Sequence, residues 1–258
     1  MWLGPQKVPP AGALASAVCR ACGRAQDGTQ ACGRPSMHAQ RQSNKGRLAA
    51  GLRGEGAEEL ELGRRQRELL ELLSDQGAVP FDQLVRFLGC KGSRVKESMR
   101  RLGRLGWIEQ RQFLAGDSEW SWLSRKGVAI ADGSHRYTVP NVRSLAHRRA
   151  INETRLFLRD KAPAGRWSSE RAIHGVAGAA EHVPDAEFEV GGERHAIEVE
   201  LSRKPPREVA EILDKHSERY DAVIYFCGPR THRLMKRVQA EGRWPKLHVC
   251  RVPGSGSC

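Results

Sequence analysis

The sequence predicts an α/β protein with two folded domains, and three observations lead to this expectation. The chain has 258 residues, and at about 100 to 200 residues per domain this length accommodates two domains that each bury a core. Apolar residues recur at helical spacing between residues 58 and 106, and then alternate with a period near two up to residue 123. From residue 141 onward, helical stretches alternate with short apolar runs that are typical of strands.

The composition favours a polyanionic partner. Lys and Arg number 43 against 30 Asp and Glu, which gives a formal net charge of +13, and an excess of this kind makes nucleic acid the leading candidate. Charged residues make up 28% and hydrophobic residues 39%, as in ordinary folded proteins. No apolar run approaches the roughly 18 residues needed to cross a bilayer. We therefore expect neither a transmembrane protein nor a membrane partner.

Residues 1–57 are expected to form a disordered N-terminal segment, because they are rich in Gly, Ala, Gln, Ser and Pro and show no helical or strand period. Within them, Cys19, Cys22, Cys32 and His38 follow the spacing C-x2-C-x9-C-x5-H, which offers tetrahedral zinc ligands. With one C-x2-C pair only, incidental cysteines in a tail are the favoured alternative. The segment does not read as a secretory signal, and the odd number of 7 cysteines indicates reduced thiols in a cytoplasm.

Three helices are predicted between residues 58 and 106. The first covers residues 58–75 and stops at Gln76-Gly77, and the second begins at Pro80 and ends at Gly89. Ser93 is the expected N-cap of the third, which closes at Gly106. The apolar stripes of the three helices are Leu69, Leu70 and Leu73; Phe81, Leu84, Val85 and Leu88; and Val95, Met99 and Leu102.

A β-hairpin is predicted next, from residues 107–114 and 119–123 around a turn at Gly116-Asp117. Three short helices followed by a hairpin make a winged helix-turn-helix, here residues 58–130, in which the third helix takes the position that enters the DNA major groove. Arg94, Glu97, Arg101 and Arg104 fall at i, i+3, i+7 and i+10, opposite the apolar stripe. The alternative is an ordinary solvated helix face. The expected DNA contacts are Arg94, Lys96, Arg100, Arg101, Arg104 and Arg111.

The second domain is predicted to cover residues 136–253, after a linker at residues 131–134. A helix over residues 141–160 precedes three strands, at 166–172, 183–190 and 194–201, and Gly191-Gly192 joins the last two as a hairpin. A helix after Pro205-Pro206, a buried parallel strand at 222–227, a helix at 231–241 and a strand at 247–252 complete it. The expected layout is αβββαβαβ.

Acidic side chains gather on the three strands of this domain. Alternation places Glu198 and Glu200 on one face of the third strand, where two neighbouring carboxylates repel each other unless water or a divalent cation offsets the charge. Asp185 and Glu170 lie on the two preceding strands. The alternative is a set of acids on a solvated sheet face. The histidines show no short ligand spacing with cysteine and are expected at the surface or the core edge: His174, His182, His195 and His216.

The order of these acidic motifs resembles the PD-(D/E)xK nuclease superfamily. Together with the winged helix, the region from Glu58 to the C-terminus is similar to the replication-relaxation proteins of bacterial plasmids and other mobile elements. The motifs that carry the resemblance are Asn141-Val142-Arg143, Trp167-Ser168-Ser169-Glu170, Val183-Pro184-Asp185-Ala186 and Glu198-Val199-Glu200-Leu201-Ser202-Arg203-Lys204.

The resemblance implies a restriction-endonuclease-like αβββαβ domain with a Mg²⁺ site. Its metal ligands would be Asp185, Glu198 and the Val199 carbonyl, with Glu170 adding one more, and its catalytic residues would be Glu170, Asp185, Glu198, Glu200 and Lys204. Glu200 stands where the superfamily usually has Lys. Lys204 is the replacement, but four residues of strand span about 13 Å, so it reaches the metal only if the chain turns after Leu201.

Two functions therefore remain open. The first is a DNA-binding protein of a plasmid or other mobile element that acts in replication or its control. The second is an active Mg²⁺-dependent endonuclease that the same winged helix directs to DNA. The expected partner in both is double-stranded DNA, and further partners would be a second copy of the chain in a homodimer or plasmid replication and mobilisation proteins.

Overall fold

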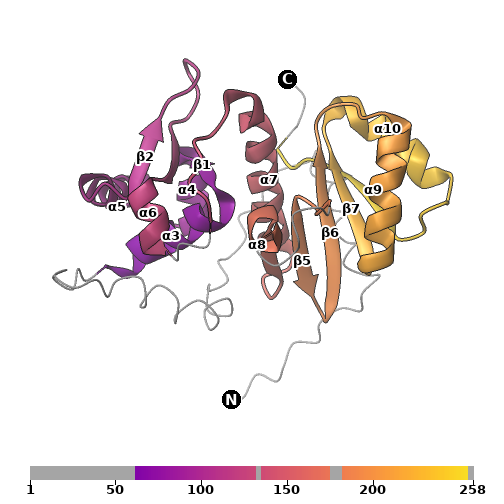
Figure 1. Cartoon of the computed structure of the whole chain (residues 1–258), viewed down its shortest axis with the longest axis horizontal. Coiled ribbons are helices and arrows are strands. Elements are labelled where there is room, and N and C mark those ends of the chain that lie inside the picture. The colour runs from indigo at the N-terminus through magenta and orange to yellow at the C-terminus, as the bar shows by residue number, and fades with distance from the viewer. Residues whose placement is uncertain (1–61, 132–134, 175–181, 255–258) are drawn as a thin grey trace. The chain divides into compact units, whose positions relative to one another are not determined.

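The computed structural model describes residues 62–131, 135–174 and 182–254, and these form two compact units (Figure 1). The first unit holds residues 62–156 and 171–174, and the second holds residues 157–170 and 182–254. The expectations for the N-terminal segment, for Cys19, Cys22, Cys32 and His38, and for the start of the first helix fall outside the described residues. No helix in the described ranges is both long and apolar enough to span a membrane.

The first unit begins with the predicted three helices and hairpin. These are α3 (Arg64–Gln76), α4 (Phe81–Leu88) and α5 (Gly92–Arg104), followed by β2 (Ile108–Arg111) and β3 (Trp120–Leu123). The apolar stripes of α3 and α5 are buried as expected and share one core with Leu84 of α4, whereas Phe81, Val85 and Leu88 are only partly buried. The N-cap of α5 is Lys91 and not Ser93, because the helix already begins at Gly92.

Two elements of this unit are missing from the sequence-based prediction. Strand β1 (Ala78–Pro80) pairs antiparallel with β3, so that the sheet has the order β1-β3-β2. Three residues are too few to show a period of two, and Pro80 had indicated only the start of a helix. Helix α6 (Arg125–Ala131) covers part of the region that was expected to lead into a linker.

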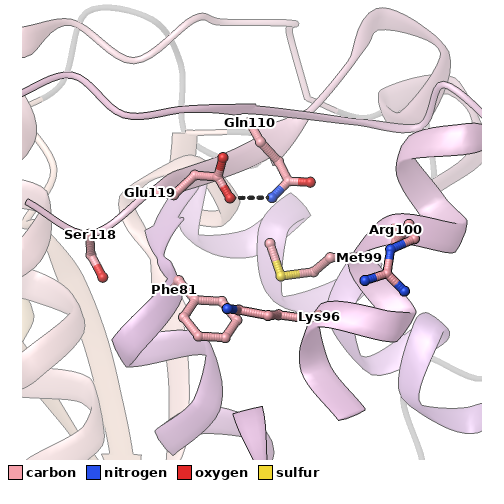
Figure 2. A pocket seen from close by; sticks show the side chains of 7 residues that line it. All are labelled: Phe81, Lys96, Met99, Arg100, Gln110, Ser118 and Glu119. Atoms are coloured by element: carbon pink, nitrogen blue, oxygen red, sulfur yellow. Dashed lines mark hydrogen bonds between the residues drawn. The ribbon is translucent and has the colours of Figure 1, made fainter. Parts of the chain in front are cut away.

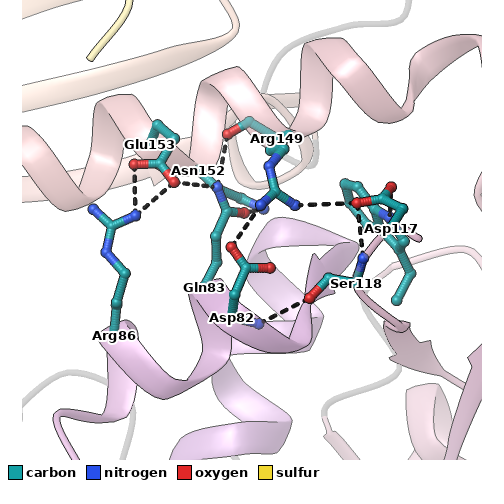
Figure 3. A network of polar contacts seen from close by, with 9 residues as sticks. Asp82, Gln83, Arg86, Asp117, Ser118, Arg149, Asn152 and Glu153 are labelled. Atoms are coloured by element: carbon teal, nitrogen blue, oxygen red, sulfur yellow. Dashed lines mark hydrogen bonds and ion pairs between the residues drawn. The ribbon is translucent and has the colours of Figure 1, made fainter. Parts of the chain in front are cut away.

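Helix α7 (Val142–Lys161) contributes its residues up to Leu156 to the first unit, where polar side chains join it to α4 (Figure 3). Arg149 Nη2 lies 2.6 Å from Asp82 Oδ2, and Glu153 Oε1 accepts hydrogen bonds from Arg86 at 2.6 Å and from Gln83 at 2.8 Å. Asn152 donates to Gln83 at 3.0 Å. Because Gln83 is fully buried, these contacts satisfy polar atoms that would otherwise destabilise the interior.

The second unit is a five-stranded mixed sheet with helices. Its elements are β4 (Arg166–Ser169), β5 (Ala186–Val190), β6 (Glu193–Glu200), α9 (Pro206–Arg219), β7 (Ala222–Cys227), α10 (Pro229–Ala240) and β8 (Leu247–Arg251). The strand order is β4-β5-β6-β7-β8; β5 is antiparallel to both of its neighbours, and the pairs β6–β7 and β7–β8 are parallel. The expected order of strands and helices is confirmed. The short helix α8 (Glu170–His174), whose residues from Arg171 onward belong to the first unit, was not predicted.

The turn between β5 and β6 confirms the hairpin predicted at Gly191-Gly192. Both glycines have positive φ, 63° and 85°, and only glycine adopts this backbone region without strain. The preceding strands are shorter than expected: β4 stops at Ser169 because Glu170 begins α8, and β5 begins at Ala186. Glu170 and Asp185 therefore lie just outside the strands on which they were placed.

Helices α9 and α10 cover the face of the sheet that carries Glu198 and Glu200. Ala196, two residues before Glu198, packs in one cluster with Tyr225 of β7, Leu213 of α9 and Met235 of α10. Glu198 is 4% exposed and Glu200 is 7% exposed. The alternative of acids on a solvated sheet face is therefore wrong for these two residues, since α9 packs on that face.

Candidate functional site

The exposed face of α5 is the first candidate site. Val95, Met99 and Leu102 lie in the core with Ser98 buried beside them, and the helical period turns the charged side chains outward. The exposed basic residues of the helix are Arg94, Lys96, Arg100, Arg101 and Arg104, with Glu97 as the acidic member. Arg111, on β2, is exposed as well. The structure thus places five of the six predicted DNA contacts on one helix and the sixth on the adjoining hairpin.

Two open hollows flank α5. Figure 2 shows the first, which has a volume of about 410 Å³ and lies between α4, α5 and the hairpin. The second, of about 630 Å³, lies against α3. Helix α5 therefore stands between two hollows and offers cations to both. The first is lined by Phe81, Lys96, Met99, Arg100, Gln110, Ser118 and Glu119, and the second by Arg65, Gln66, Glu97, Ser98, Arg101, Arg104 and Leu105.

Aromatic rings support two of the cations at this face. The Lys96 ammonium lies 5.3 Å from the centre of the Phe81 ring, and the Arg111 guanidinium lies 5.4 Å from the centre of the Phe113 ring. Such contacts hold a long side chain over a ring without removing its charge. In the same hollow, Gln110 donates a hydrogen bond of 2.7 Å to Glu119 (Figure 2). The face is therefore mainly basic, with Glu97 on the helix and Glu119 at the hairpin as its acids.

The second candidate site is the group of charged side chains where β5 begins and β6 ends. Asp185 Oδ2 accepts a hydrogen bond of 2.7 Å from the Val199 backbone N–H, which fixes the carboxylate beside β6. The Glu170 N–H donates to the Asp185 carbonyl at 3.0 Å, but the Glu170 side chain is exposed. The backbone thus brings three predicted metal-site residues together, while the carboxylates of Glu170 and Glu198 differ sharply in their exposure to water.

Glu198 is bound to two histidines. Its Oε1 lies 2.7 Å from His216 Nε2 and 3.5 Å from His182 Nε2, and the two imidazole rings stack with their centres 5.4 Å apart. Burial raises the pKa of Glu198, but hydrogen bonds from His182 and His216 and the charges of His216 and Lys204 outweigh it, so the pKa is held below its usual value. The hydrogen bond to Glu198 raises the pKa of His182 in turn, against the effect of its burial.

The Lys204 side chain lies next to Glu200, the last residue of β6. Its Nζ lies 3.1 Å from Glu200 Oε2, and the Ser202 N–H donates to Glu200 Oε1 at 3.0 Å. Burial lowers the pKa of Lys204, but the charges of Glu200, Glu198 and Asp185 outweigh it and hold the pKa above its usual value. The turn after β6 that the sequence required for Lys204 to approach the acids is therefore present.

The histidines of this group were not predicted as functional residues. His195 and His216 are fully buried, so the expectation of surface or core-edge positions is wrong for both. The sequence did contain a signal, because His216 lies at helical spacing from Ile212 and Leu213 on the buried side of α9. Within the described ranges, one group of three His, Cys, Asp or Glu residues has ligand atoms all within 4.8 Å of one another, and it is His182, Glu198 and His216.

These donors do not fit the Mg²⁺ implied by the resemblance. Mg²⁺ prefers six oxygen ligands in near-octahedral geometry. Here, Glu198 Oε1 faces two imidazole nitrogens, and Asp185 Oδ2 is engaged by the Val199 amide. The arrangement offers nitrogen where Mg²⁺ requires oxygen.

Comparisons with known proteins add little to this geometry. No protein-family model matches the chain, and no curated protein matches it. Two matching solved structures are mutants of Lactococcus lactis ZitR, one with a single substitution and one with two. The first is 19% identical and covers 32% of this chain and 56% of its own, and the second is 16% identical and covers 33% of this chain and 61% of its own. The TM-score is 0.27 for each. The chain thus spans less than two thirds of the length of these structures. At this TM-score, the likeness supports no conclusion about the fold or the function of the chain. Membership of the replication-relaxation family is not shown.

Proposed function

We propose that the protein binds double-stranded DNA, with α5 entering the major groove and the β2–β3 hairpin acting as a wing beside it. The observation that carries the proposal is the exposed basic face of α5, opposite its buried stripe. The element order α3, β1, α4, α5, β2, β3 supports a winged helix-turn-helix, in which this helix takes the groove-binding position.

The chemistry of the face suits a duplex. Arginine donates two parallel hydrogen bonds to guanine or to a phosphate, and lysine mainly contacts phosphate as a point charge. Four arginines and one lysine are exposed on α5 against one glutamate. Such a face provides phosphate contacts, which supply sequence-independent affinity, and long donors that reach base edges.

The experiment compares two double variants with equal loss of charge. Arg101→Ala/Arg104→Ala removes two cations from α5, and Arg230→Ala/Arg233→Ala removes two exposed cations with the same spacing from α10. Because an arginine that contacts a base contributes about 1–3 kcal/mol, we expect the α5 variant to bind a DNA duplex at least about tenfold more weakly. The α10 variant should bind like the wild type. Equal affinities in fluorescence anisotropy for the two variants would contradict the proposal.

For the cellular role, we propose action in replication, or in its control, on a plasmid or other mobile element. The support is the combination in one chain of the winged-helix element order with the αβββαβ order of the second unit, whose sheet β4-β5-β6-β7 is consistent with a restriction-endonuclease-like domain. Deleting the gene from the replicon that encodes it and counting replicon copies per cell tests this role. An unchanged copy number and an unchanged inheritance of the replicon would contradict it.

Metal-dependent cleavage of DNA is the second candidate function. The observation that favours it is Lys204, whose ammonium lies 3.1 Å from Glu200 and thereby supplies a cation beside the acids. Incubation of supercoiled DNA with the protein in Mg²⁺, Mn²⁺ or EDTA tests it. Nicking that needs the metal and is lost in Asp185→Ala would support an endonuclease, whereas DNA binding without any cleavage would support the binding protein.

A further inference from the structure

Three ligand atoms in the second unit converge on one point. Glu198 Oε1 lies 2.7 Å from His216 Nε2 and 3.5 Å from His182 Nε2, and all three atoms lie within 4.8 Å of one another. They come from β6, from α9 and from the segment before β5. We propose that His182, Glu198 and His216 bind a divalent transition metal ion of the Zn²⁺ class.

The donor set is the one that such an ion prefers. Zn²⁺ binds imidazole nitrogen at about 2.0–2.1 Å and carboxylate oxygen at about 2.0–2.2 Å, so neighbouring ligand atoms in a tetrahedral site lie about 3.3 Å apart. The two measured separations, 2.7 and 3.5 Å, fall on either side of that value. Small rotations of the side chains therefore suffice. Two histidines and one glutamate leave a fourth position open, as zinc sites with bound water do.

A second observation in the same place points to a ligand. Tyr225 of β7 is the register partner of Glu198 of β6, and it lies on the same covered face of the sheet. Its hydroxyl is fully buried and has no hydrogen-bond partner among the described protein atoms. Burial raises the pKa of Tyr225, and the charges of Glu198, Glu200 and Asp185 raise it further, which places the hydroxyl near these carboxylates. A metal-bound water would give this hydroxyl a partner.

Some of the surrounding charges oppose a bound metal ion and others favour it. Lys204 and Lys215 lie close enough to His182 to lower its pKa, and the same cations oppose a bound metal ion. Lys204 is held by Glu200, however, and the charges of Asp185 and Glu200 act on the same region. A neutral imidazole is the ligand form, so a bound metal ion takes the place of the direct contact between His216 Nε2 and Glu198 Oε1.

Binding of Co²⁺ tests this site directly, because its absorption spectrum depends on the ligands. The full chain, freed of metal with a chelator, is titrated with Co²⁺ under reducing conditions and followed by visible and near-ultraviolet absorption. We expect one ion with the visible bands of a tetrahedral or five-coordinate site and without the near-ultraviolet band that thiolate ligands produce. This distinction separates the site from Cys19, Cys22 and Cys32. No binding, or a spectrum with thiolate bands only, would overturn the proposal.

Two conservative variants and one control assign the ligands. His182→Gln and Glu198→Gln should each weaken Co²⁺ and Zn²⁺ binding by roughly 100-fold or more, since loss of an outer partner alone costs about 10- to 100-fold. His232→Gln, which changes a partly buried histidine of α10, should bind like the wild type. Because the His182 side chain is 38% exposed, its variant tests the site even if a change at Glu198 impairs folding. Unchanged affinity in His182→Gln would show that the histidines form a structural ion pair only, and the proposal would fail.

Heat stability gives an independent measurement. Because a ligand that binds only the folded chain stabilises it, excess Zn²⁺ should raise the melting temperature of the wild type and of His232→Gln but not of His182→Gln. Equal shifts in all three proteins would place the bound metal elsewhere. The proposal does not depend on DNA binding by α5, so either can fail without the other.

Discussion

Helix α5 and strand β6 both carry closely spaced charges, but the charges of α5 are exposed to water and those at the end of β6 are buried. The basic side chains of α5 are exposed, and its buried residues are Val95, Ser98, Met99 and Leu102. On β6, by contrast, Glu198 and Glu200 are both buried, and each has a cationic or imidazole partner within 3.1 Å. The two charged groups therefore differ in their exposure to water and in how far they are already paired.

The difference follows from the cost of desolvation. An exposed charge keeps its water and remains available to a large polyanion, whereas a buried charge destabilises the fold unless partners satisfy it. The α5 face is therefore accessible to a phosphate backbone as we propose, whereas the β6 group is not. Each prediction below tests one side of this contrast.

The largest expected effect is on β6. Glu198→Ala leaves His216 buried without its acceptor, and removal of one partner from a buried pair costs about 3–5 kcal/mol. We expect a loss of that size in the free energy of unfolding, measured with urea in the presence of a chelator. The matched control is Glu211→Ala on α9, whose partner Arg207 is exposed, and it should cost less than about 1 kcal/mol. Equal losses in the two variants would break the contrast.

A smaller effect is expected at the other end of the same group. Lys204→Met removes the cation from Glu200 but leaves the hydrogen bond from the Ser202 N–H. Because the Lys204 side chain is 28% exposed, solvent screens the pair, and we expect a loss of about 1 kcal/mol in the free energy of unfolding. Lys215→Met, at an exposed position, serves as the control. A loss as large as that in Glu198→Ala would mean that exposure does not set the cost.

The smallest effect is expected in the pH dependence of stability, at the half-buried His248. Burial, followed by the charges of His195 and Lys236, holds the pKa of His248 below 6.5. His248 then binds a proton less readily in the folded than in the unfolded chain, so its contribution to stability is fully present above pH 6.5 and is lost as the pH falls through the folded pKa. His248→Gln should flatten this decline between pH 7 and pH 5 in urea unfolding. An identical pH profile for the variant and the wild type would count against burial as the cause.

Much of the fold could be predicted because apolar periodicity determines which side of an element is buried. The stripe Val95, Met99 and Leu102 and the apolar run of β7 lie in the core as expected. The elements that escaped prediction, β1, α6 and α8, have three, seven and five residues. Elements this short carry too few residues for a period, and tertiary pairing determines their conformation.

The site was less predictable for a physical reason. Alternation along β6 correctly placed Glu198 and Glu200 on one face, and it could not show that α9 covers this face. The partners of Glu198 lie 16 residues before it and 18 residues after it, at His182 and His216, so no local spacing indicates their contact. The same two histidines are the reason why the donors around Glu198 do not suit the Mg²⁺ that the resemblance implies.

The central claim is that α5 contacts the DNA backbone, and the salt dependence of binding tests it most directly. The logarithm of the binding constant falls against the logarithm of the salt concentration with a slope of about −0.9 for each phosphate contact. If Arg101 and Arg104 each contact one phosphate, the slope for Arg101→Ala/Arg104→Ala should be shallower than that of the wild type by about 1.8, while Arg230→Ala/Arg233→Ala keeps the wild-type slope. Identical slopes for all three proteins would contradict the account.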